Sequence, residues 1–113
     1  MEVLTVDATP NAQLYVMTAR IPAEGVDKFN AYESHVLPLL GEHGARLERR
    51  LQSRDRLNEV HIIWFPSPKS FENYRTDPRR TEYAYLLVES GAAIELRVMK
   101  DVSDSATNQP ETY

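Results

Sequence analysis

The sequence predicts one α+β domain of the ferredoxin-like βαββαβ type, with a four-stranded antiparallel sheet in the order 4-1-3-2 and both helices on one face. The length of 113 residues suits a single hydrophobic core. Runs of β-branched and aromatic residues alternate with helical periods in the order β, α, β, β, α, β. The two runs that this order makes central are apolar on both faces, whereas the edge runs alternate with charged residues, which discourages edge pairing.

The first predicted strand spans residues 13–21, and Pro22 ends it because proline cannot donate a hydrogen bond to a β-ladder. A long helix is predicted over residues 24–43, since apolar residues recur there at helical spacing and Gly44 follows as a left-handed cap. Pro38 removes one amide inside this helix, so we expect a kink there rather than an end.

The next two predicted strands, residues 46–53 and 58–65, form a hairpin. Simple alternation along the first of them places Leu47 and Leu51 on one face. We therefore expect both leucines to pack on the same side of the sheet.

Two cap signals divide the second helical region. Ser67 before Pro68 and Asp77 before Pro78 each combine an N-cap residue with proline at the first helical position. We therefore expect two helical pieces, with Gly91 closing the second.

The last predicted strand spans residues 93–102, where apolar and polar residues alternate again. The domain is thus predicted over residues 13–102, preceded by an extension over 1–12. Residues 103–113 are polar and aperiodic, and we expect a disordered tail whose deletion leaves the melting temperature nearly unchanged.

Composition excludes several classes of protein. The chain has no cysteine, which excludes disulfide frameworks, thiolate nucleophiles and cysteine-ligated metal sites. A net charge of −4 argues against nucleic acid as a partner, because phosphate binding needs a basic face. No apolar run approaches the roughly 20 residues that cross a bilayer, so we expect no membrane association. The N-terminal residues lack the features of a secretory signal, and we expect a cytoplasmic protein.

The predicted central strands are apolar on both faces, and two helices can cover only one of them. Leaving the other face in water would expose a large apolar patch. A second copy of the sheet would cover it with one self-complementary surface, so we expect a homodimer. The alternating residues are Leu14, Tyr15, Val16 and Met17 in the first strand and Val60, Ile62, Ile63, Trp64 and Phe65 in the third.

Three segments, LPLLGEHGARL, FPSPKSFENY and DPRRTEYAYLL, resemble the dimeric α+β barrel superfamily and, within it, the domain of unknown function 1330 family. The stretches YESHVLPLL and LNEVHIIW also resemble the NIPSNAP family of the same superfamily. The similarity covers residues 14–102 and implies a dimeric α+β barrel. The superfamily contains cofactor-independent monooxygenases, lactone isomerases, haem enzymes and stress-response proteins, so the resemblance does not imply one chemistry.

Two residues are candidates for acid–base chemistry. Helical spacing from Phe29 turns Glu33 toward the core, where desolvation would raise the pKa of its carboxyl group. The alternative is a carboxylate at the margin of the apolar stripe that reaches water or a structural arginine. Strand alternation places His61 on one face with Ile63 and Phe65, as a general base or ligand or as a hydrogen-bonded core residue.

Four further residues are candidates for ligand binding. Arg20 and Arg97 lie on neighbouring predicted strands and could meet an anionic ligand, pair with Glu33 or Glu95, or occupy sheet ends as structural residues. Tyr32 and Trp64 could line a pocket for a flat apolar molecule or fill the core.

No cofactor or metal is predicted. The three histidines are dispersed and lack paired-ligand spacing, and no nucleotide-binding loop or nucleophile elbow occurs. Two functions stay open: an enzyme or binding protein for a small molecule, with a pocket between helices and sheet, and a non-catalytic stress-response or structural dimer. A pocket with a shifted carboxylate or histidine favours the first, and a filled core favours the second.

Overall fold

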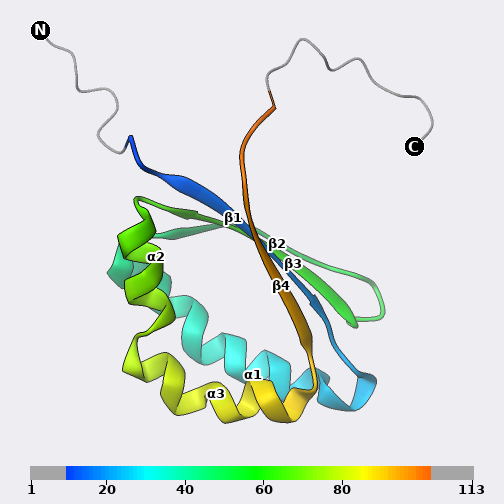
Figure 1. The fold of residues 1–113 in the computed structure, drawn as a ribbon. Helices are drawn as coiled ribbons and strands as arrows, with labels where there is room; N and C mark the ends of the chain where they lie inside the picture. The colour runs from blue at the N-terminus through cyan, green and yellow to red at the C-terminus, as the bar shows by residue number, and fades with distance from the viewer. Residues whose placement is uncertain (1–9, 103–113) are drawn as a thin grey trace, which may run out of the picture.

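The computed structural model describes residues 10–102 as one layer of helices on one four-stranded sheet (Figure 1). Most of the predicted extension 1–12 and all of the predicted tail 103–113 lie outside the described residues. The elements are β1 (Gln13–Arg20), η2 (Ala23–Gly25), α1 (Val26–Val36), η3 (Leu37–His43), β2 (Arg46–Gln52), β3 (Asn58–Phe65), α2 (Pro68–Arg75), α3 (Pro78–Ser90) and β4 (Ala93–Met99).

The sheet has the strand order β2-β3-β1-β4, and every neighbouring pair is antiparallel. This is the predicted order 4-1-3-2 read from the other edge, so the fold prediction is confirmed. Side chains of the central strands alternate as predicted. Those that face the helices are buried and those of the opposite face are half-buried.

The predicted continuous helix over residues 24–43 is wrong in its second half. The α-helix ends at Val36, and residues Leu37–His43 continue as the 3-10 segment η3. Pro38 stands at the start of this segment, where it supplies no amide for an α-helical hydrogen bond, and the chain tightens instead of kinking. Gly44 ends the segment with a φ of 74°, the predicted left-handed cap.

The two predicted cap signals are confirmed. The side chain of Ser67 accepts a hydrogen bond from the amide of Ser70 at 3.0 Å, at the start of α2. Asp77 accepts one from the amide of Arg79 at 2.9 Å, at the start of α3. Gly91 closes α3 with a φ of 74°.

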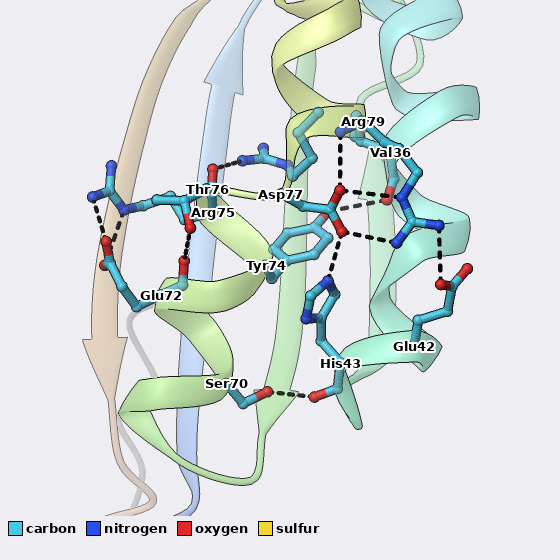
Figure 2. Close-up of polar contacts among 11 residues, drawn as sticks. Val36, Glu42, His43, Ser70, Glu72, Tyr74, Arg75, Thr76, Asp77 and Arg79 are labelled. Carbon is cyan, nitrogen blue, oxygen red and sulfur yellow. Dashed lines mark hydrogen bonds and ion pairs between the residues drawn. The ribbon is translucent and has the colours of Figure 1, made fainter.

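A polar cluster ties the junction of α2 and α3 to the helical segments that precede β2 (Figure 2). Asp77 accepts a hydrogen bond from His43 Nε2 at 2.8 Å and one from the guanidinium of Arg79 at 2.9 Å. These bonds, that of Arg79 first, hold the pKa of Asp77 well below its ordinary range. The hydroxyl group of Tyr74 donates to the carbonyl of Val36 at 3.2 Å. The helical layer is therefore held together by side chains as well as by packing.

Strand β2 carries a bulge between Leu47 and Arg49, so one extra residue, Glu48, interrupts the pairing with β3. Leu47 pairs opposite Ile63 and packs on the helical side, whereas Leu51 is 40% exposed. The prediction that both leucines share a face is wrong, because an extra residue inverts the alternation of every residue after it.

Among the residues that the structure describes, no helix is long and apolar enough to cross a membrane.

Candidate functional site

A cavity of about 150 Å³ lies between the helices and the sheet face that they cover. Its walls are mainly apolar, and Tyr15 stacks on Phe71 with the ring centroids 4.2 Å apart. Ile94 and Leu96 of β4 also line it and are 40% and 45% exposed. The cavity therefore reaches solvent beside β4, at the strand that the helices leave uncovered. Four residues of the lining have polar side chains with a potential chemical role: Tyr32, Glu33, His61 and Arg80.

Glu33 lies on the inner face of α1 and is 5% exposed. Among the described residues, no side chain or amide donates a hydrogen bond to its carboxyl group. Burial raises the pKa of Glu33 to about 7, with Arg50 and Arg80 opposing the rise and Glu59 adding to it. Both protonation states of this carboxyl group are therefore populated at neutral pH, as a general acid or base requires.

His61 lies on β3, faces the same cavity and is 1% exposed. Its Nε2 atom is 2.8 Å from Oε1 of Glu59. Burial lowers the pKa of His61, against the opposing effect of Glu59. The ring is therefore neutral at pH 7 and can accept a proton.

The side chain of Glu59 is fully buried and accepts hydrogen bonds from β2. Arg50 donates to both of its oxygens, at 3.0 and 3.2 Å, and Gln52 donates at 2.8 Å. Burial alone would raise the pKa of Glu59, but the hydrogen bonds from Arg50, His61 and Gln52 outweigh it and hold the pKa below its ordinary value. Glu59 is therefore an ionised carboxylate.

Arg80 enters the cavity from α3. Its guanidinium donates to the hydroxyl of Tyr32 at 2.8 Å and to the carbonyl of Arg75 at 3.2 Å, and it lies 4.6 Å from the ring centroid of Tyr74. Its Nε atom is buried and has no hydrogen-bond partner among the described residues. An unpaired buried donor is costly, so a ligand oxygen placed there would gain a charge-assisted hydrogen bond.

Three of the six residues predicted from sequence come together. Glu33, His61 and Tyr32 line this one cavity. The structure places the other three elsewhere. Trp64 lies on the opposite sheet face, 4.1 Å below the guanidinium of Arg46.

The two predicted arginines also lie outside the cavity. Arg20 is exposed at the end of β1, in a shallow depression with Gly91 and Asn58. Arg97 is exposed on β4 and pairs with Glu95 at 3.1 Å. Neither arginine is among the residues that line the cavity.

Sequence reasoning missed Glu59 and Arg80. Glu59 could have been found, because strand alternation places it on the face of His61 in a central strand. Arg80 precedes Leu87 by seven residues, which puts both on one side of a helix, and both line the cavity. Within residues 10–102, no cluster of three side chains suited to a metal ion occurs.

No protein-family model and no curated protein matches the chain. Solved structures share its fold. One is a protein from Bacteroides thetaiotaomicron provisionally assigned as an antibiotic biosynthesis monooxygenase, with a TM-score of 0.72 and 12% identity over 90% of this chain and 100% of that one. Another is SnoaB, a cofactor-independent oxygenase from Streptomyces nogalater. Its TM-score is 0.67, with 13% identity over 85% of this chain and 98% of that one.

A third solved structure is a NIPSNAP family protein of unknown function from Agrobacterium tumefaciens, with a TM-score of 0.64 and 17% identity over 85% of this chain and 93% of that one. At these identities the likeness concerns the fold alone. These proteins share the ferredoxin-like α+β fold of this chain.

Proposed function

We propose that the protein binds a small, single-ring organic molecule in the cavity and transfers protons to and from it. The observation that carries this proposal is the convergence of Glu33, His61 and Arg80 on one mainly apolar cavity. A filled core would have favoured the non-catalytic dimer instead. A cavity of about 150 Å³ in another protein holds benzene, which sets the scale of the ligand at one ring.

The three groups suit proton exchange on an enolisable carbonyl compound. His61 removes a proton from carbon, and the negative charge that develops on the carbonyl oxygen is stabilised by Arg80. Glu33, when protonated, returns a proton to that same carbon. One proton leaves the substrate and one enters it, so the reaction needs no oxidant or reductant.

A panel of single-ring enolisable carbonyl compounds, cyclohexanone among them, tests this proposal. The wild-type protein should speed the exchange of their α-hydrogens for deuterium, measured by proton NMR in D₂O. Glu33→Gln and His61→Asn should each slow this exchange by about 100-fold or more, as general acid–base groups typically contribute that much. The matched control is Glu82→Gln, which changes an exposed carboxylate of α3.

Equal exchange in all four proteins, or no acceleration by the wild type with any compound, would contradict the proposed function. Dissolved dioxygen is followed in parallel with an electrode. Steady oxygen uptake with any compound would instead indicate an oxygenase, the activity for which the similar structure of SnoaB is named.

We also propose that the sheet face opposite the helices forms a homodimer interface. The half-buried side chains of this face are Leu14, Val16, Thr18, Val60, Ile62 and Trp64. Light scattering at micromolar concentration should give twice the mass of one chain. Ile62→Glu should yield monomers, because it places a charge at the centre of the interface. Val88→Glu changes an exposed apolar residue of α3 and should stay dimeric. A wild-type monomer would contradict the proposal.

Two finer assignments belong to the same proposal. The segments LPLLGEHGARL and FPSPKSFENY support membership in the domain of unknown function 1330 family. A cytoplasmic location is proposed as well, and a sequence without cysteine is consistent with it.

A further inference from the structure

We propose that Glu59 is a positioning residue that fixes His61 in the tautomer with the proton on Nε2 and so leaves Nδ1 as the acceptor available to the cavity. The use of that acceptor in proton transfer rests on the proposed function, whereas the tautomer itself does not. The contact on which the proposal stands is the 2.8 Å distance between His61 Nε2 and Glu59 Oε1.

The direction of this hydrogen bond follows from the surroundings of Glu59. Its two oxygens already accept from the bidentate guanidinium of Arg50 and from the amide of Gln52. A guanidinium and an amide nitrogen can only donate, so both oxygens act as acceptors. A carboxylate in this position has no proton to give, and the bond to His61 must therefore be donated by Nε2–H.

The charge of His61 follows from its burial. The ring is 1% exposed, and the guanidinium of Arg50 donates to the same oxygen of Glu59, Oε1, that His61 Nε2 contacts. A second cation here would be desolvated beside the first, which favours the neutral ring. A neutral imidazole with its proton on Nε2 has an unprotonated Nδ1.

Nδ1 of His61 has no hydrogen-bond partner among the described residues, and His61 lines the cavity. The other charged or titratable groups of the lining are Glu33, Arg75 and Arg80 and the tyrosines Tyr15, Tyr32 and Tyr74. None of these is hydrogen-bonded to His61 among the described residues. The lone pair on Nδ1 is thus left for a ligand.

The β2 bulge makes this arrangement possible. Because of the extra residue, Arg50 pairs opposite His61 and Gln52 opposite Glu59, so both face the helical side. Without the extra residue in β2, the side chain of Leu51 would face the helical side, and the carboxylate of Glu59 would lose its hydrogen-bond donors. An ionised, fully buried carboxylate is costly without such donors.

Nitrogen-15 NMR of the histidine rings at pH 7 tests the tautomer directly. In the wild-type protein the His61 signals should be those of a neutral ring with protonated Nε2 and unprotonated Nδ1. The His61→Asn variant assigns these signals among the three histidines. Glu59→Gln removes the obligate acceptor, so the protonated-Nδ1 tautomer should become populated. Glu33→Gln is the control, because it changes the cavity and leaves the Glu59 contact intact.

Wild-type signals of an imidazolium ring, or of the protonated-Nδ1 tautomer, would overturn the proposal even if Glu59→Gln fails to fold. An unchanged tautomer in a folded Glu59→Gln protein would also overturn it. In the exchange assay, Glu59→Gln should lower the rate by about 100-fold, because the wrong tautomer presents no base. The expected tautomer in a wild type without exchange activity would contradict the proposed function alone, since the tautomer does not depend on it.

Discussion

Replacing Glu33 with glutamine should stabilise the folded protein at pH 8 by on the order of 3 kcal/mol and leave its stability at pH 4 nearly unchanged. The cause is the cost of ionising a carboxyl group that is 5% exposed. Burial raises the pKa of Glu33 to about 7 from an ordinary value of 4.5. Glutamine has nearly the shape of the protonated acid and cannot ionise.

The direction of this change in stability with pH follows from proton binding at Glu33. Between pH 4.5 and about 7 the folded protein holds a proton at Glu33 that the unfolded chain has released. The free energy of unfolding of the wild type therefore falls as the pH rises through this window, and that of Glu33→Gln lacks this component. Below pH 4.5 the group is protonated in both states, so the two proteins converge.

Urea unfolding of wild type and Glu33→Gln at pH 4, 6 and 8 measures the effect. The difference in free energy of unfolding should grow with pH. Glu82→Gln, which changes an exposed carboxylate, should show no such growth. A difference for Glu33→Gln that is the same at all three pH values would mean that Glu33 is not desolvated.

Replacing Gly25 with alanine should destabilise the protein by about 1–3 kcal/mol or more, the range typical of overpacking. Gly25 is buried at the end of η2, where the chain passes the C-terminal end of α3. A Cβ atom there would collide with the backbone carbonyl of Ser90, which cannot rotate away as a flexible side chain could. The pairing of α1 with α3 would have to open to admit it.

Gly41→Ala is the matched control, because a Cβ built at that position meets no atom within 4 Å beyond its own stretch of backbone. This variant should be neutral or slightly stabilised, since alanine restricts the unfolded chain. Thermal unfolding should show a loss of about 4–8 °C per kcal/mol for Gly25→Ala. Equal melting temperatures for the two variants would contradict the close approach of η2 and α3.

Predictions from sequence succeeded where one local pattern decides the outcome. Helical spacing alone placed Glu33 inside, because α1 is regular and its buried stripe has one centre at Phe29. Strand alternation placed His61 correctly, because β3 pairs without irregularity with β1. The caps at Ser67 and Asp77 are likewise local.

Predictions failed where distant segments decide the outcome. The β2 bulge is a feature of the pairing with β3, where it brings Arg50 and Gln52 to Glu59, and simple alternation along β2 alone carries no trace of it. Alternation over residues 46–53 therefore predicted the wrong sheet face for Leu51. Arg80 was missed because its role depends on Tyr32, which lies 48 residues earlier in the chain.

The bulge at Glu48 also bears on how this hairpin can change length in evolution. The pairing of Arg46 and Leu47 is regular before it, and that of Arg49 onward is regular after it. Loss of the codon for residue 48 would join these two regular parts into a straight strand and leave Arg50 opposite His61. Loss of the codon for Leu51 would instead turn the side chain of Gln52 to the opposite sheet face, and Glu59 would lose that hydrogen-bond donor. Among descendants of this gene, a one-residue gap at position 48 is thus compatible with an intact cavity, and a gap a few positions later is not.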